Sequence, residues 1–265
     1  MLYFLSLGSG SCGNSYYLSN GSYGILIDAG IGIRVLKKHF VEWGLELADI
    51  RYIFVTHDHA DHVKSVGKLS YELNVPVYAT AKVHEGIDNN FCVHKKIPRN
   101  NVVTMVKGST LHLDEGLSVT SFHVPHDSND NVGYNISWGG TTFTLMTDIG
   151  HVTDEMRRYI HEAEHLVIEA NHDELMLLNG NYPPYLKERI SSGGGHLSNA
   201  DCAEALAENA SERLRDVWLC HLSQENNHPE LARKTVEKAL LQRPTINVTL
   251  QVLKRRTPCG TYSLN

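Results

Sequence analysis

Residues 50–62 read IRYIFVTHDHADH. The first seven residues form a β-branched, apolar run that is typical of a buried strand. Four potential metal ligands follow closely: His57, His59, Asp61 and His62. A strand-to-helix turn can direct alternate side chains toward two different ions, and imidazole with carboxylate favours Zn, Mn or Fe over Ca or Mg. The alternative is a polar turn with surface histidines, which so dense a group of ligands directly after a buried strand disfavours.

The composition excludes several classes of protein. The chain has 265 residues, 24 Lys+Arg against 30 Asp+Glu, a formal net charge of −6 and 42% hydrophobic residues. These values exclude a disordered or fibrous chain, and the acidic total argues against a protein that coats nucleic acid by bulk charge. No apolar run reaches the roughly 18–20 residues that span a bilayer, and the N-terminus lacks the basic region of a signal peptide. Five widely spaced cysteines without a CxxC pair favour a reducing compartment, so we expect a cytoplasmic protein without membrane association.

Strand-like and helix-like segments alternate along the chain, which predicts an α/β fold. We expect one domain over residues 1–265, with two mixed sheets and helices outside them. The pattern predicts helices at residues 31–40, 63–73, 154–163, 200–210 and 229–241. Strands are expected at residues 2–7, 15–19, 23–29, 50–56, 75–79, 117–124, 134–138, 141–147, 166–170, 216–220 and 246–253. Residues 91–110 and 179–195 are the least regular, and no internal repeat stands out.

Three isolated polar residues follow other apolar strands. His126 follows residues 117–124, Asp148 follows residues 141–147, and His221 follows residues 216–220. Strand ends of open α/β sheets are where ligands bind. Taken alone, each residue is more often a cap or a turn residue. Together with the HxHxDH loop, they predict a two-metal site.

These motifs resemble those of the metallo-β-lactamase superfamily. They occur in the same order as in that family, and they extend over nearly the whole chain. Asp28 in IDAG matches the first motif, and HxHxDH, His126, Asp148 and His221 match the following four. The resemblance implies a four-layer αβ/βα sandwich of two mixed β-sheets flanked by helices, with two divalent metal ions per chain (Zn, Mn or Fe). It implies that one ion is held by His57, His59 and His126, the other by Asp61, His62 and His221, with Asp148 bridging. It also implies that Asp28 orients a ligand imidazole.

Further stretches are similar to the YycJ (WalJ) group of this superfamily. They are LGSGS with GNS at residues 7–15, EANHD at 169–173, the segment 182–190, GHLSN at 195–199 and HLSQENN at 221–227. The glycine-rich turn at residues 192–195 departs from the group's expected pattern. The position of the bridging ligand is Asp148 rather than the cysteine of many lactam-hydrolysing members. This resemblance implies nuclease activity on DNA, including 5′-to-3′ exonuclease activity on duplex DNA.

Catalytic roles follow for three residues. Asp61 would hold the attacking water together with the ions. His196, supported by Glu169, resembles the Glu/His pair that ribonuclease Z uses near its leaving group, and histidine suits proton transfer near neutral pH. Glu169 is alternatively a structural carboxylate at a strand end. His196 is alternatively part of a helix entry, with Ser198 or Asn199 as the N-cap.

The sequence indicates substrate-contacting residues less specifically than it indicates metal ligands. Lys187 and Arg189 are candidates for gripping phosphates, with an ordinary charged helix face as the alternative. Ser198 is a candidate substrate contact as well as a cap. The basic runs that contain Lys95 and Arg255 are typical of solvated surface. The loop GSGSCGNS is followed by no lysine, so we interpret it as a turn near the active edge rather than a phosphate loop.

The sequence therefore predicts a two-metal phosphodiesterase, in particular a DNA nuclease with nucleic acid as its substrate. One alternative is a metal-dependent hydrolase of a small phosphodiester or thioester. Another is a non-catalytic, metal-containing module that binds nucleic acid. Metal identity, cleavage polarity, the choice of DNA or RNA, and oligomeric state stay open.

Overall fold

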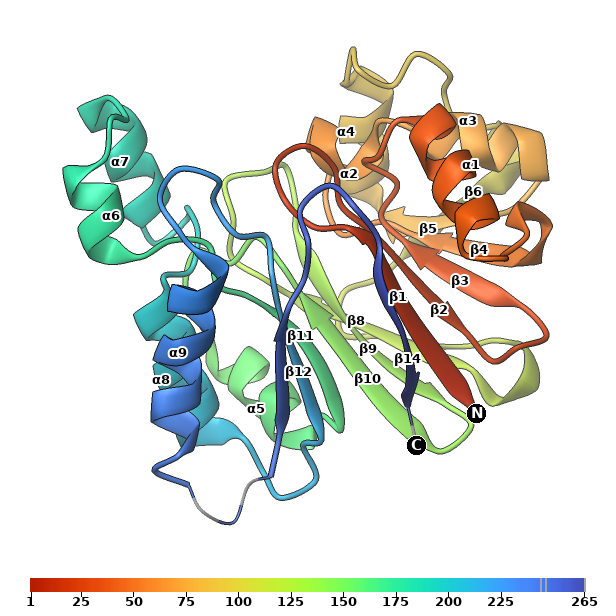
Figure 1. The fold of residues 1–265 in the computed structure, drawn as a ribbon. Coiled ribbons are helices and arrows are strands. Elements are labelled where there is room, and N and C mark those ends of the chain that lie inside the picture. Colours follow the sequence, from red (N-terminus) through yellow and green to blue (C-terminus); the bar gives the residue numbers. More distant parts are fainter. Residues whose placement is uncertain (244, 246, 265) are drawn as a thin grey trace. The chain divides into compact units, whose positions relative to one another are not determined.

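Two seven-stranded mixed sheets organise the computed structural model, which describes residues 1–243, 245 and 247–264 (Figure 1). By its internal contacts the chain divides into two units, and each unit contains one sheet. Unit 1 consists of Met1–Ser109, Ser128–Asn131 and the described residues from Lys254 onward, and unit 2 consists of Thr110–Asp127 and Val132–Leu253. The expected pair of mixed sheets flanked by helices is confirmed.

The sheet of unit 1 has the order β14-β1-β2-β3-β4-β5-β6. Its C-terminal strand pairs antiparallel with its N-terminal strand. The strands are β1 (Leu2–Gly8), β2 (Ser15–Ser19), β3 (Gly24–Ile27), β4 (Ile50–Phe54), β5 (Val77–Thr80), β6 (Val102–Met105) and β14 (Cys259–Leu264). The helices are α1 (Ile33–Glu42), α2 (Ala60–Val63), α3 (Val66–Leu73) and α4 (Ala81–Asn89), with 3₁₀ turns at Leu47–Asp49 and Arg99–Asn101.

The sheet of unit 2 has the order β13-β12-β11-β10-β9-β8-β7. Its strands are β7 (Thr110–His112), β8 (Ser118–His123), β9 (Val132–Trp138), β10 (Thr141–Met146), β11 (His165–Glu169), β12 (Asp216–Cys220) and β13 (Thr249–Val252). The helices are α5 (Asp154–Glu162), α6 (Glu174–Asn179), α7 (Pro184–Ser191), α8 (Asn199–Asn209) and α9 (Pro229–Leu240), with a 3₁₀ turn at Asp114–Gly116. In Figure 1, α6 and α7 lie together apart from α5, α8 and α9.

The two sheets repeat the same ladder pattern although the sequence shows no repeat. From β14 to β3 and from β7 to β10, neighbouring strands are antiparallel, and the remaining pairs in each sheet are parallel. Parallel strands need crossover connections, and helices supply most of them. At the change of direction, Asp28 follows β3 with φ 60° and Asp148 follows β10 with φ 56°. The two units therefore place a left-handed aspartate at equivalent points.

Each unit has its own hydrophobic core between its sheet and its helices. In unit 1, Leu36, Leu69 and Val83 from α1, α3 and α4 pack with strand residues such as Ile53. In unit 2, α5, α8 and α9 supply the helical side of the core. No helix in the described part of the chain is both long and apolar enough to cross a membrane.

Several short elements differ from the predicted pattern. The helix expected at residues 63–73 is observed as α3 (Val66–Leu73), and the unpredicted short helix α2 (Ala60–Val63) precedes it, with Lys64 and Ser65 between the two. Helices α4, α6 and α7 and strands β6, β7 and β14 were not predicted, which for α6, β6 and β7 follows from spans of only three to six residues. The strand expected at residues 246–253 is observed as Thr249–Val252, and Ile246 lies outside the described residues. The hairpin turn at Gly139 and Gly140 is confirmed, with φ values of 61° and 87°.

Gly30 allows the loop after β3 to approach the HxHxDH loop. A Cβ atom at residue 30 would lie 1.6 Å from the backbone oxygen of Asp61, whereas a Cβ at Gly32 would meet nothing within 4 Å. We therefore expect Gly30→Ala to lower the free energy of unfolding by on the order of 3 kcal/mol, because backbone must move to relieve the overlap. Gly32→Ala is the matched control. Chemical denaturation compares the two, and equal stability of both variants would contradict this account.

Candidate metal centre

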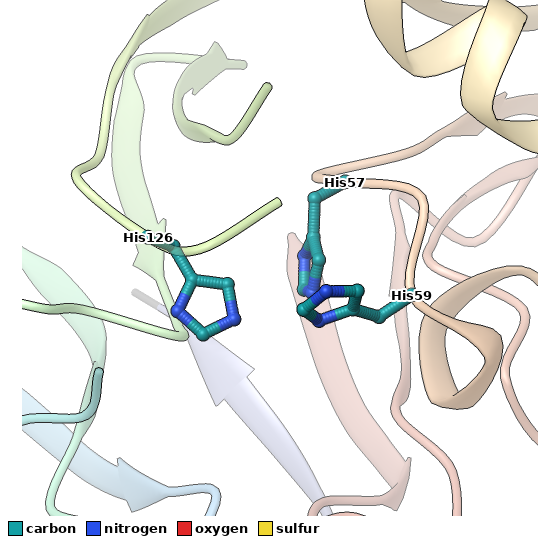
Figure 2. Close-up of side chains that lie close together, drawn as sticks. All are labelled: His57, His59 and His126. Carbon is teal, nitrogen blue, oxygen red and sulfur yellow. The ribbon is translucent and has the colours of Figure 1, made fainter. Parts of the chain in front are cut away.

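The HxHxDH residues of unit 1 form a compact group of imidazoles. His57 and His59 lie on the loop between β4 and α2, whereas Asp61 and His62 lie in α2 itself, and Figure 2 shows His57 and His59 with their rings side by side. The ring centroids of His57 and His59 are 4.7 Å apart, and those of His57 and His62 are 4.0 Å apart. The side chains of His57 and His62 are fully buried. The Asp61 carboxylate lies 3.7 Å from Nε2 of His62.

Asp28 supports this group of imidazoles through hydrogen bonds. Its buried carboxylate accepts hydrogen bonds from the Thr56 amide and hydroxyl, each at 2.8 Å, and lies 2.7 Å from Nδ1 of His62. A carboxylate that accepts from Nδ1–H leaves the lone pair on Nε2, the nitrogen that a metal would bind. The same Thr56 hydroxyl lies 3.0 Å from Nδ1 of His57. Asp28 therefore sets the ring orientation of one predicted ligand directly and of another through Thr56.

Asn14 is a site residue that the sequence reasoning missed. Its side-chain amide lies 2.8 Å from Nε2 of His62 and 3.3 Å from the Asp61 carboxylate. Its backbone amide also donates to the Asp61 carbonyl at 2.8 Å. The available signal was the GNS motif at residues 13–15, which was interpreted as a turn near the active edge. That interpretation overlooks the Asn14 amide, which contacts two predicted ligands.

The glycine loop also has a cation beside it. Arg255 is far away in sequence, but its guanidinium lies 3.4 Å from the Ser11 hydroxyl and its backbone oxygen accepts from the Ser9 amide. Sequence reasoning looked for a lysine following the loop, as in a phosphate loop. The structure instead supplies a cation from the segment before β14.

His126 in unit 2 is held by a backbone carbonyl. It lies on the loop that follows β8, and it is the third side chain labelled in Figure 2. Its Nδ1 lies 2.9 Å from the Gly195 oxygen, so the Nδ1–H donates and Nε2 keeps the lone pair. Its Nε2 lies 3.8 Å from the Asp148 carboxylate. The glycine-rich turn that departs from the expected family pattern thus provides the acceptor that orients this histidine.

The remaining candidates of unit 2 surround the carboxylate of Glu169. The possible ligand atoms of Asp148, Glu169, His196 and His221 all lie within 4.8 Å of one another. Asp148 and His221 both have left-handed backbone conformations, with φ of 56° and 52°, directly after β10 and β12. For non-glycine residues this conformation is uncommon and is concentrated at functional sites.

Glu169 accepts four hydrogen bonds although it is fully buried. Two come from the backbone amides of Ile149 and Leu197, at 2.6 and 3.2 Å. Two come from imidazoles, with Nδ1 of His196 at 2.8 Å and Nδ1 of His221 at 3.0 Å. Glu169 thereby orients His221, a predicted metal ligand, as well as His196. Sequence reasoning assigned it only the second of these roles.

The electrostatics of this pair favour an ionised carboxylate and a protonated imidazole. Burial raises the pKa of Glu169, but the charge of His196 and the hydrogen bonds from both histidines outweigh it and lower the pKa to about 2. Burial lowers the pKa of His196, but the neighbouring Glu169 carboxylate outweighs this effect and raises the pKa. Nε2 of His196 has no hydrogen-bond partner among the described residues. The ring can therefore carry a proton at an atom that is not engaged by the protein.

The predicted substrate contacts all have structural partners. The Ser198 hydroxyl accepts from the Asp201 amide at 3.0 Å and is the N-cap of α8, as one reading of the sequence proposed. Lys187 Nζ donates to the Leu178 carbonyl at 2.7 Å. Arg189 forms a two-pronged ion pair with Asp127, the neighbour of His126. Their roles toward substrate stay predictions.

The EANHD segment (residues 169–173) supports the loop after β12 and begins α6. Asn171 donates its side-chain amide to the His221 carbonyl at 2.8 Å. The N-cap of α6 is Asp173, because the Asp173 carboxylate accepts from the Met176 amide at 2.9 Å. Asn171 therefore supports the loop of a predicted metal ligand.

Comparisons with known proteins agree with this arrangement. Residues 23–221 match the family described as "Beta-lactamase superfamily domain". Exodeoxyribonuclease WalJ of Streptococcus pneumoniae is 35% identical over 237 residues, which cover 89% of this chain and 87% of that protein. Exodeoxyribonuclease YycJ of Bacillus anthracis is 35% identical over 239 residues, which cover 90% of this chain and 89% of that protein. Zn²⁺-bound PqqB from Methylobacterium extorquens shares the fold, with a TM-score of 0.72, 18% identity and coverage of 98% and 100% of the two chains.

Glu169→Gln tests the role of the buried carboxylate in metal-free protein. Removing one partner of a buried ion pair costs about 3–5 kcal/mol, whereas the exposed control Glu162→Gln should change stability by less than about 0.5 kcal/mol. Thermal and denaturant unfolding after chelation measure the difference. A Glu169→Gln variant as stable as the control would contradict this role.

The pH dependence of the same metal-free protein follows from the two pKa shifts. The contribution of Glu169, whose pKa is lowered, is present above its ordinary value of 4.5 and is lost as the pH falls through about 2. The contribution of His196, whose pKa is raised, is present below its ordinary value of 6.5 and is lost as the pH rises through its folded value. Stability from the pair is therefore greatest between about pH 4.5 and 6.5. Glu169→Gln should flatten this dependence in unfolding measured across the range.

Proposed function

The chain belongs to the metallo-β-lactamase superfamily, and on this basis we propose that it is a metal-dependent phosphodiesterase acting on DNA, as an exonuclease. The observation that carries the proposal is the Glu169–His196 ion pair beside Asp148 and His221. A protonated imidazole next to predicted metal ligands suits a reaction in which a leaving oxygen needs a proton. Both relatives are named exodeoxyribonucleases, and the similarity covers most of their length, which supports DNA as the substrate.

The donor set of each unit fits divalent transition ions. Unit 1 offers three clustered imidazoles and the Asp61 carboxylate, and unit 2 offers His126, Asp148 and His221. Mixed imidazole and carboxylate ligands of this kind suit Zn, Mn or Fe. The family pattern assigns His57, His59 and His126 to one ion, Asp61, His62 and His221 to a second, and Asp148 to both. We propose this assignment, with the chain of residues 1–265 acting as one domain.

The ions, when bound, would polarise the phosphodiester and lower the pKa of a water molecule. The protein's own side chains and backbone groups would orient the ligands and the attacking water. Asp28, Glu169 and the Gly195 carbonyl fix the tautomers of three ligand histidines, so that the nitrogens facing the ions keep their lone pairs. Asp61 would accept a hydrogen bond from the attacking water. This preorganised set costs no rearrangement when the substrate arrives.

His196 supplies the proton for the leaving oxygen in this proposal. Glu169 holds Nδ1–H and stabilises the imidazolium, which leaves the proton on Nε2 available for the 3′ or 5′ oxygen that departs. Because the pKa of His196 is raised, the ring is protonated at a higher pH than an ordinary histidine. Its role is that of a general acid, and Glu169 acts through it as a positioning residue.

We also infer a reducing, cytoplasmic location. All five cysteines are free thiols, and none of them is paired in a disulfide. Widely spaced free thiols are characteristic of proteins that work in reducing compartments.

Metal dependence is the first test of the proposed function. We expect purified protein to contain divalent transition ions and to cut end-labelled DNA, and chelation should abolish the cutting. His59→Ala and Asp148→Ala should lose both bound metal and activity, whereas the exposed control His112→Ala should keep both. Elemental analysis and gel assays measure these outcomes. Cleavage by His59→Ala or Asp148→Ala at the wild-type rate would show that the mechanism is wrong.

His196→Ala separates proton transfer from metal binding. We expect turnover to fall by about 10²–10⁴-fold, as is typical when a general acid is lost, with the metal content unchanged. The alkaline limb of the pH–rate profile, which reports deprotonation of His196, should disappear in the variant. A parallel loss of metal would instead identify His196 as a structural residue of the site. Assays with bis-p-nitrophenyl phosphate, a thioester and DNA identify the substrate class.

A further inference from the structure

A groove of about 510 Å³ lies on unit 1 outside the proposed metal site. It is lined by the first turn of α1 (residues 32–35) and by Lys64, Ser65, Lys68, His94 and Lys95. We call it the α1–α3 groove. Its lining contains no acidic residue, in a chain whose formal net charge is −6.

Four cations concentrate positive charge around the groove. Arg34, Lys64, Lys68 and Lys95 are all exposed. Lys68 forms an ion pair with Glu72 at 3.0 Å, and Lys95 Nζ lies 3.8 Å from the Tyr71 ring centroid. Arg34 and Lys64 form no ion pair with any described residue. Their charges are therefore available to an anion from solution.

The start of α1 adds to this positive field. The helix begins at Ile33 after Gly32, with no side-chain cap and no acidic residue in its first turn. The first amides of a helix have no intrahelical acceptor, and the helix dipole gives this end partial positive charge. An anion in the groove would meet both these amides and the side-chain cations.

The groove adjoins the HxHxDH loop through short hydrogen bonds. The Ser65 hydroxyl donates to the Ile31 carbonyl at 2.6 Å, and the Ser65 amide donates to the Ala29 carbonyl at 2.8 Å. The Ala29 amide in turn donates to the carbonyl of His62 at 2.7 Å. Lys64 follows His62 by two residues. The backbone that carries Lys64 is therefore tied directly to the backbone of the HxHxDH loop.

The apolar part of the lining also suits a nucleic acid. Ile33 is partly buried and Val35 is 46% exposed, so each presents apolar surface beside the charges. Sugars and bases offer apolar faces between phosphates, and such mixed surfaces bind strands through phosphate contacts with little reading of sequence. We propose that the α1–α3 groove binds backbone phosphates of the substrate strand beyond the scissile bond. This inference rests on the proposed function and extends it to a second contact region.

The double variant Arg34→Gln/Lys64→Gln tests the groove. Binding of metal-loaded protein to a labelled phosphorothioate duplex, which resists cleavage, is followed by fluorescence anisotropy over a range of salt concentrations. Losing two phosphate contacts should weaken binding by about tenfold or more near 0.1 M salt and reduce the slope of log K against log salt by about 1–2. Lys82→Gln/Arg99→Gln is the matched control, because it removes the same charges from exposed positions outside the groove.

Three other outcomes decide against the groove, and a fourth tests the proposed function separately. Equal loss of affinity in both double variants would show that bulk charge, not the groove, attracts DNA. Unchanged DNA affinity with lost binding to anionic lipid vesicles or to an acidic peptide would assign the groove to another ligand. If the Arg34→Gln/Lys64→Gln variant lost hydrolysis of bis-p-nitrophenyl phosphate to the same extent as cleavage of DNA, the result would show damage to the metal site instead. If the wild-type protein cleaves no DNA, the proposed function fails, and the binding measurement still decides the groove.

Discussion

The carboxylate of Glu169 holds together the part of unit 2 that carries chemistry. It accepts hydrogen bonds from three segments that are distant in sequence: the loop after β10, the loop before α8 and the loop after β12. A buried charge without partners would cost several kcal/mol, and these four donors offset that cost. Because the same carboxylate contacts His196 and His221, the proposed acid and a predicted metal ligand depend on one group for their geometry.

In unit 1, Asp28 plays the corresponding role of orienting a histidine. The topology of the sheet explains its position. Both sheets change from antiparallel to parallel pairing after β3 and after β10, and an aspartate in left-handed conformation follows each strand. At such a point the chain must leave the sheet sharply to enter a crossover. Asp28 orients His62 through hydrogen bonds, whereas Asp148 is proposed to bind metal directly. Equivalent positions in the two units thus carry the same residue type with different roles.

Charge is arranged locally in this protein rather than by its total. The acidic sum argued against binding nucleic acid by bulk charge, and that argument still holds for the surface as a whole. The α1–α3 groove nevertheless gathers four cations without an acidic neighbour in its lining. Fields from such clusters act over about a Debye length, so a local patch can attract a polyanion that the net charge would repel.

The sequence by itself determined the fold class, the family and the positions of the predicted ligands. HxHxDH after an apolar strand is a local pattern, and apolar strands such as residues 216–220 were placed correctly because their signal lies within a few residues. The sequence also offered Ser198 as one of two possible caps, since capping rules are read along the chain. The helix α6, with only six residues, was missed because so few residues carry too little periodicity.

Only the tertiary structure decided which groups support the ligands. Asn14 contacts His62, Gly195 accepts from His126, and Glu169 reaches His221, each across many residues of sequence. Hydrogen bonds of this kind depend on where loops meet in space, and no spacing rule relates such partners along the chain. The same reason explains β14, whose pairing partner is β1 at the other end of the sequence, and the α1–α3 groove, whose cations come from three separate segments.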